Sequence, residues 1–113
     1  MPLLMVRYNV AEDGAEKVIG AVERAFAALE EQRPEGIRYA YYRRAGGTEF
    51  VALLELDEGI ENPLPGIGAA RELQATVAEW VVGQPPAPQP LDVLGSYGWP
   101  ADAPTRRDEE SVR

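Results

Sequence analysis

Residues 37–56 read IRYAYYRRAGGTEFVALLEL, and their pattern identifies the central element of the fold. Its first part is rich in aromatic side chains, its last part mixes acidic and apolar ones, and Ala45-Gly46-Gly47-Thr48 between them is typical of a tight turn. The sequence therefore predicts a β-hairpin with Gly46 and Gly47 at the turn. The predicted register pairs Arg44 with Glu49, Tyr42 with Val51, Ala40 with Leu53 and Arg38 with Glu55 on one face, and Arg43 with Phe50, Tyr41 with Ala52, Tyr39 with Leu54 and Ile37 with Leu56 on the other.

Charge and hydrophobicity both favour this register. It places two pairs of opposite charge on one face and three apolar pairs on the other. A slip of one residue would send the partners to opposite faces of the sheet. Because an exposed ion pair contributes only ~0.2–1 kcal/mol, the apolar face determines the register more strongly than the charged one.

Two elements are predicted before the hairpin. Residues 4–10 alternate between apolar and polar side chains, which is the period of a strand with one apolar face. A helix is expected from Ala15, after Asp13 as a cap, and Pro34 and Gly36 end it. The apolar residues of this helix recur at three- and four-residue spacing: Val18, Val22, Ala25, Phe26 and Leu29.

The chain after the hairpin is predicted to add a loop, a helix and a last strand. Residues 57–66 contain two prolines and two glycines and are expected to form a loop, and helical spacing runs from Ile67 to Gly83. The proline-rich residues 84–90 are expected to connect this helix to a strand over residues 91–99. We therefore expect one domain over residues 1–99 and a disordered, charged tail over residues 100–113.

The order strand, helix, strand, strand, helix, strand predicts an α+β, ferredoxin-like βαββαβ fold, with two helices on one face of a four-stranded antiparallel sheet. The other face is expected to be apolar at its centre, charged at its rim and covered by a second copy in a homodimer. On this face we place Met5, Arg7, Asn9, Arg38, Ala40, Tyr42, Arg44, Glu49, Val51, Leu53, Glu55, Asp92, Leu94 and Ser96.

Composition excludes several classes of function. Eleven basic against nineteen acidic residues give a formal charge of -8, which disfavours nucleic acid as a partner. The 113 residues include no cysteine and no histidine, which removes disulfides, thiolate nucleophiles, His-based triads, the common zinc sites and His-ligated haem. Asp57, Glu58 and Glu61 lack the spacing of a calcium loop, so no metal is expected. The apolar runs are short and the N-terminus lacks the pattern of a secretion signal, so we expect a cytoplasmic protein with no membrane segment.

Three short stretches carry a family resemblance: Pro34-Glu35-Gly36-Ile37, the segment EFVALLEL at residues 49–56, and Glu61-Asn62-Pro63-Leu64-Pro65. With the element order, they make residues 3–99 resemble the dimeric α+β barrel superfamily, and within it the small proteins related to antibiotic-biosynthesis monooxygenases. The resemblance implies a barrel of two sheets face to face and a ligand cavity in each protomer between the sheet and the helices or loop. It also implies oxygenation of phenols without a cofactor, in which Asn, Trp, Tyr and Arg side chains hold an anionic substrate.

Residues of suitable type give the candidate pocket, although no spacing maps them onto a catalytic pattern: Arg7, Asn9, Arg38, Tyr42, Glu55, Asn62 and Trp80. Each has a structural alternative. Trp80 fits the apolar stripe of its helix, and Tyr39 and Tyr41 are expected to face the helices as core residues. The Arg and Glu residues are expected to form salt bridges between strands or sheets, and Asn62 to form a turn through its side chain.

Three functions stay open at this point. The first is a cofactor-independent, monooxygenase-like enzyme that acts on an aromatic or quinol-type small molecule. The second is a non-catalytic, dimeric ligand-binding or stress-related protein of the same fold. The third is a barrel filled by side chains, with no cavity at all.

Overall fold

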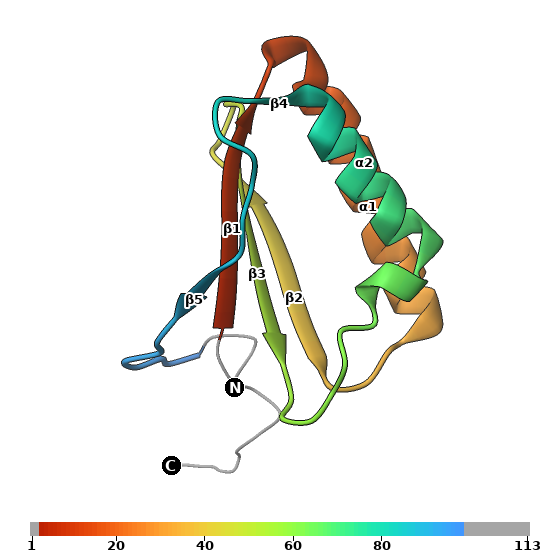
Figure 1. Cartoon of the computed structure of the whole chain (residues 1–113), viewed down its shortest axis with the longest axis vertical. Coiled ribbons are helices and arrows are strands. Elements are labelled where there is room, and N and C mark those ends of the chain that lie inside the picture. The colour runs from red at the N-terminus through yellow and green to blue at the C-terminus, as the bar shows by residue number, and fades with distance from the viewer. Residues whose placement is uncertain (1–2, 99–113) are drawn as a thin grey trace.

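Two helices cover one face of an antiparallel sheet in the computed structural model, which describes residues 3–98 (Figure 1). The strands are β1 (Leu3–Val10), β2 (Ile37–Arg43), β3 (Glu49–Leu56), β4 (Val81–Val82) and β5 (Gln89–Leu91). The helices are α1 (Ala15–Gln32) and α2 (Gly68–Trp80), each preceded by a short 3₁₀ turn, η1 (Glu12–Gly14) and η2 (Leu64–Gly66). The predicted ferredoxin-like α+β fold is confirmed. Trp99 and the predicted tail at residues 100–113 lie outside the described residues.

The hairpin forms with the predicted register. Every predicted pair from Ile37 with Leu56 to Arg43 with Phe50 is present between β2 and β3. At the turn, the amide of Arg44 donates to the carbonyl of Glu49 over 2.9 Å. The predicted ion pair of Arg38 with Glu55 closes to 2.9 Å between Nε and Oε1, and Arg44 Nη2 lies 2.9 Å from Glu49 Oε1.

The fourth strand differs from the prediction. No strand covers residues 92–98; instead β4 and β5 pair with opposite ends of β1, so that the sheet runs β2-β3-β1 with two short segments at the last edge. The segment predicted as a proline-rich connection thus contains the first two residues of β5, and only Leu91 of the predicted strand is in the sheet. Pro90 fits there because this position is at the edge of the sheet, where a strand residue without an N–H is tolerated.

The phase of the last strand was also predicted wrongly. Leu91 pairs with Leu3 and therefore lies on the open face, whereas the predicted alternation places it towards the helices. Asp92, Leu94 and Ser96, which the prediction places on the open face, follow β5 as an exposed segment outside the sheet. Alternation alone gives the period of a strand, but only the pairing with β1 sets which residues face inward.

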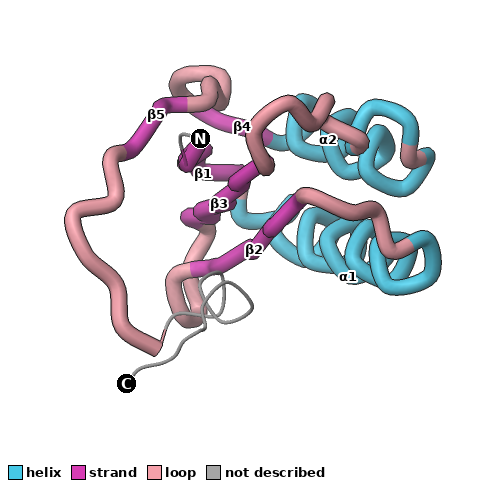
Figure 2. Tube along the Cα trace, turned by 90° about the horizontal axis from the view of Figure 1, so that it is seen from below, coloured by secondary structure: helices cyan, strands magenta, loops and turns pink. Residues whose placement is uncertain are grey.

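The core lies between the helices and the sheet, as two groups of buried residues. The larger group is centred on side chains such as Val18, Phe50 and Leu73, which are at most 2% exposed. The smaller group contains Leu64, Ile67 and Ala70 from η2 and the start of α2. Figure 2 shows both helices on the same side of the sheet, which leaves the opposite face of β1, β2 and β3 uncovered.

Among residues 3–98, no helix is long and apolar enough to cross a membrane, and no group of three or more acidic residues is placed to hold a metal ion.

Candidate functional site

A cavity of about 400 Å³ lies between the helix-facing side of the sheet and the segment formed by η2 and α2. Its walls combine alternate residues of β1, β2 and β3 with apolar residues of η2 and α2 and with two prolines from the connection between β4 and β5. They are Leu4, Val6, Tyr8, Tyr39, Tyr41, Ala52, Leu54, Asn62, Leu64, Pro65, Ala70, Arg71, Gln74, Val77, Pro86 and Pro88. The size is within the range of small-molecule sites, and members of both buried groups line it.

Three tyrosines give this cavity its polar groups on the sheet side. Tyr8 from β1 and Tyr41 from β2 share a hydrogen bond between their hydroxyl groups. The ring of Tyr41 meets Tyr39 edge to face at 6.0 Å, and the ring of Tyr8 stacks on Phe50 at 5.6 Å. Aromatic packing of this kind fixes the rings, and therefore the direction of the hydroxyls.

Burial keeps these phenols protonated. It raises the pKa of Tyr8 to about 12, since loss of solvent outweighs the opposing effect of the hydrogen bond with Tyr41. Burial also raises the pKa of Tyr39 and of Tyr41 above the ordinary value. At neutral pH these phenols therefore keep their protons and do not act as bases. Tyr39 and one hydroxyl of the Tyr8–Tyr41 pair can donate to a bound oxygen atom, because the other hydroxyl of the pair donates within the pair.

The remaining polar groups of the cavity come from η2, α2 and the residues before them. Asn62 Oδ1 accepts a hydrogen bond from the amide of Leu64 over 3.0 Å, which is the predicted side-chain turn. Arg71 Nη1 donates to the carbonyl of Pro65 over 2.8 Å, and Gln74 is exposed. No aspartate, glutamate or histidine lines the cavity, so its described wall contains no general base for neutral pH.

Five of the seven predicted site residues lie on the open face of the sheet and not in this cavity. Their pairing positions place Arg7, Asn9, Arg38, Tyr42 and Glu55 there. Arg38 binds two carboxylates, Glu55 at 2.9 Å and Asp57 at 2.6 Å, and Arg7 lies 2.9 Å from Glu49. These ion pairs match the structural alternative predicted for the charged residues.

Asn62 is the one predicted residue that lines the cavity, and Trp80 lies elsewhere. Trp80 ends α2, packs against the larger buried group, and its carbonyl accepts a hydrogen bond from the amide of Ala11 over 3.0 Å. A Cβ atom on Gly14 would lie 2.5 Å from the Trp80 ring, so a glycine is required for this close approach. The structure therefore does not bring the seven residues together.

Sequence reasoning missed the tyrosine pair as a site. The signal was present, because alternation places Tyr8 on the helix-facing side of its strand and the hairpin register places Tyr41 there too. What the pattern does not give is the space beside them. The same side chains in a tightly filled core would show an identical alternation.

Several solved structures match this chain, among them three that match over most of their own length. Rv0793 from Mycobacterium tuberculosis is 21% identical, with a TM-score of 0.63, and the match covers 85% of this chain and 98% of that one. A protein from Nitrosomonas europaea described as a "Putative antibiotic biosynthesis monooxygenase" is 19% identical, with a TM-score of 0.63 and coverage of 86% and 93%. NE2512 from Nitrosomonas europaea, a protein of unknown function, is 16% identical, with a TM-score of 0.61 and coverage of 85% and 91%.

The chain has the fold of these proteins. The resemblance in fold to small proteins related to antibiotic-biosynthesis monooxygenases is thereby confirmed. No protein-family model matches the sequence, and no curated protein matches it either.

Proposed function

We propose that this protein binds an aromatic or quinol-type small molecule in the cavity between sheet and helices and oxygenates it without a bound cofactor. The observation that carries the proposal is the hydrogen-bonded pair of Tyr8 and Tyr41 in an otherwise largely apolar cavity. Apolar walls with a few fixed polar groups are what a flat aromatic ligand needs, because the walls bind its rings and the polar groups set its orientation.

The chemistry follows from which groups are present. Since the tyrosine hydroxyls stay protonated, they stabilise negative charge that develops on a phenolic oxygen of the ligand. Exclusion of water strengthens this interaction. Since no carboxylate or histidine lines the cavity, the ligand itself has to be acidic enough to lose its proton.

A naphthol illustrates how atoms and electrons balance in the proposed reaction. Naphthol plus O₂ gives naphthoquinone plus water: one oxygen atom becomes the new carbonyl, and the other leaves as water with two hydrogens of the substrate. The substrate supplies all four electrons, so no external reductant is required. The protein's part is to orient the ring, exclude water and hold the anionic oxygen against the tyrosine hydroxyls.

We propose in addition that the open face of the sheet is the interface of a homodimer. Half-buried apolar residues such as Ala40, Val51 and Leu53 lie at its centre, and the ion pairs of Arg7 and Arg38 lie at its rim. A face of this composition resembles an interface core surrounded by a polar rim. A cytoplasmic location stays part of the proposal.

One observation favours the second function, a binding protein without catalysis. The described wall of the cavity offers donors and apolar side chains but no base. These groups are sufficient to bind a ligand, whereas oxygenation also requires a substrate that loses its proton without a protein base. The two functions therefore share a site and differ in whether the bound aromatic consumes oxygen.

Oxygen consumption with a panel of naphthols tests the enzymatic function, with formation of the oxygen-inserted quinone measured by mass in the same samples. We expect turnover by the native chain, and on the order of 10²-fold lower kcat in Tyr8→Phe and Tyr41→Phe, because one substitution removes the donor to the ligand and the other removes the hydroxyl that orients it. Tyr97→Phe removes a fully exposed hydroxyl and is the matched control. Saturable binding without oxygen consumption would favour the binding protein, and absence of both would contradict the proposed function.

A further inference from the structure

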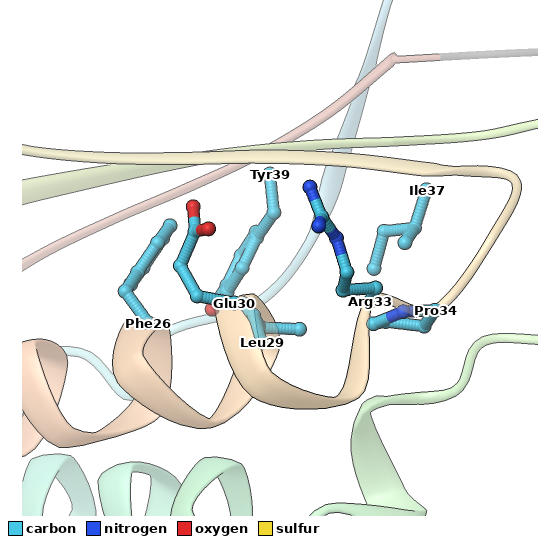
Figure 3. Close-up of a pocket in the computed structure, with 7 residues that line it drawn as sticks. All are labelled: Phe26, Leu29, Glu30, Arg33, Pro34, Ile37 and Tyr39. Atoms are coloured by element: carbon cyan, nitrogen blue, oxygen red, sulfur yellow. The ribbon is translucent and has the colours of Figure 1, made fainter.

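A second hollow, which we call the groove, lies beside the cavity, between β2 and the last turns of α1. Phe26 and Leu29 from α1 and Ile37 and Tyr39 from β2 form its apolar lining, and its volume is about 310 Å³ (Figure 3). Among the described residues, the groove and the cavity have a single lining residue in common, which is Tyr39. The side chain of Tyr39 therefore lies between the two hollows.

Aromatic packing holds the ring of Tyr39 in this position. The ring of Phe26 stacks on it at 5.2 Å, with 9° between the two planes, and the ring of Tyr41 meets it edge to face at 6.0 Å. Phe26 lines the groove and Tyr41 lines the cavity, so the ring is supported from both sides. Figure 3 shows the Tyr39 side chain reaching from β2 to α1. The ring thus closes the space between sheet and helix at this point.

Another boundary of the cavity is polar and open to solvent. Arg71 and Gln74 of α2 are exposed there, and Arg71 Nη1 lies 2.8 Å from the carbonyl of Pro65. Aromatic rings that extend in this direction would stay largely in water and would gain little, because hydrophobic stabilisation is proportional to the apolar area removed from water. On the side towards α1, the apolar interior of the cavity ends at the ring of Tyr39.

The volume of the cavity sets the size of ligand that fits beside the Tyr8–Tyr41 pair. A cavity of ~150 Å³ holds one benzene ring, so about 400 Å³ accommodates roughly two or three fused rings. If the ring of Tyr39 were removed, the cavity and the groove would become one continuous space. A larger ring system could then extend past this position and pack against Leu29 and Ile37.

We infer that Tyr39 is a specificity-determining residue, whose ring limits the ligand to aromatic molecules of no more than about three fused rings. This inference rests on the proposed function, because it assigns the size limit of the same site. The ring excludes a larger ligand by occupying the space into which a further fused ring would extend. Protein interiors are close-packed, so the additional atoms would force neighbouring side chains out of their favoured positions.

Two fluorescent phenols, 1-naphthol and the four-ring 1-hydroxypyrene, test the inference by equilibrium binding under nitrogen. The measured quantity is the dissociation constant of hydroxypyrene divided by that of naphthol, because effects common to both ligands cancel in this ratio. In Tyr39→Ala we expect the ratio to fall at least about 10-fold, or 1.4 kcal/mol, which is the order of the cost of overpacking. Tyr39→Phe keeps the ring and should keep the ratio of the native chain.

Tyr39→Leu is a second variant without the ring, and it retains a larger apolar side chain in case alanine leaves the core too loosely packed to fold. Circular dichroism reports whether each variant folds. Methyl chemical shifts locate the larger ligand. In Tyr39→Leu, hydroxypyrene should shift the methyl groups of Leu29 and Ile37 in the groove, whereas in the native chain these shifts should stay unchanged.

The outcomes separate this inference from the proposed function. If naphthol binds to the native chain and the ratio is the same in folded Tyr39→Leu, the inference is overturned and the proposed function stands. An equal fall in Tyr39→Phe and Tyr39→Leu would also overturn it, because the hydroxyl and not the ring would then set the limit. If naphthol does not bind to the native chain, the proposed function is refuted and this inference with it.

Discussion

Replacing Tyr41 with phenylalanine removes one hydroxyl from the cavity and leaves Tyr8 without its partner. Tyr8 is only 4% exposed, so water reaches its hydroxyl poorly and the lost hydrogen bond is not fully replaced. An unsatisfied buried donor costs about 1–3 kcal/mol. We therefore expect Tyr41→Phe to lower the free energy of unfolding by about 1 kcal/mol or more, which lowers Tm by about 4–8 °C in a domain of this size.

The double variant Tyr8→Phe/Tyr41→Phe separates the hydrogen bond from the packing. When both hydroxyls are absent no donor is left unsatisfied, so its loss of stability should be smaller than the sum of the two single losses. Urea unfolding of the native chain and of the three variants gives the coupling free energy, which we expect to be about 1 kcal/mol. Additive single effects would show that the two hydroxyls do not interact and would refute the arrangement assigned to the cavity.

Three further predictions concern other parts of the molecule. Burial raises the pKa of Tyr8 to about 12, so the stabilisation from its protonated form should be complete below pH 10. As the pH rises from 10 to 12, the free energy of unfolding should fall by about 3 kcal/mol, and urea unfolding should show a smaller fall for Tyr8→Phe. Gly14→Ala should cost about 1–3 kcal/mol, because its Cβ would meet the Trp80 ring at 2.5 Å, whereas Gly66→Ala has open space and should change the thermal midpoint little. Leu53→Asp, at the centre of the open face, should convert a dimer into a monomer in analytical ultracentrifugation, and an unchanged dimer would exclude this face as the interface.

The hairpin could be predicted to the residue because two independent constraints agree there. The turn at Gly46 and Gly47 fixes the pairing locally, and charge on one face with apolar side chains on the other selects the same register. The end of the first helix could likewise be predicted. The helix ends at Gln32, Arg33 caps it in the left-handed conformation with a φ of 49°, and Pro34 follows this cap.

The last strand and the cavity could not be predicted because they depend on contacts between distant parts of the chain. β5 is selected by pairing with Leu3 to Met5, and its own sequence, Gln89-Pro90-Leu91, has a weak strand pattern. The cavity is a volume left between sheet and helices, and a pattern of apolar positions does not report volume. The predicted site residues were chosen by type, so they scattered over the open face, the cavity and the end of α2.

Chemical-shift mapping with a naphthol under nitrogen locates the bound ligand without requiring turnover. Binding in the cavity predicts shifts at side-chain methyl groups on both walls, those of Ala52 and Leu54 on β3 and of Ala70 and Val77 on α2, with weakened binding in Tyr41→Phe. Shifts confined to the open face, at Ala40 and Val51, would contradict it and would place the binding site on the side of the sheet where sequence analysis put most of its candidate residues.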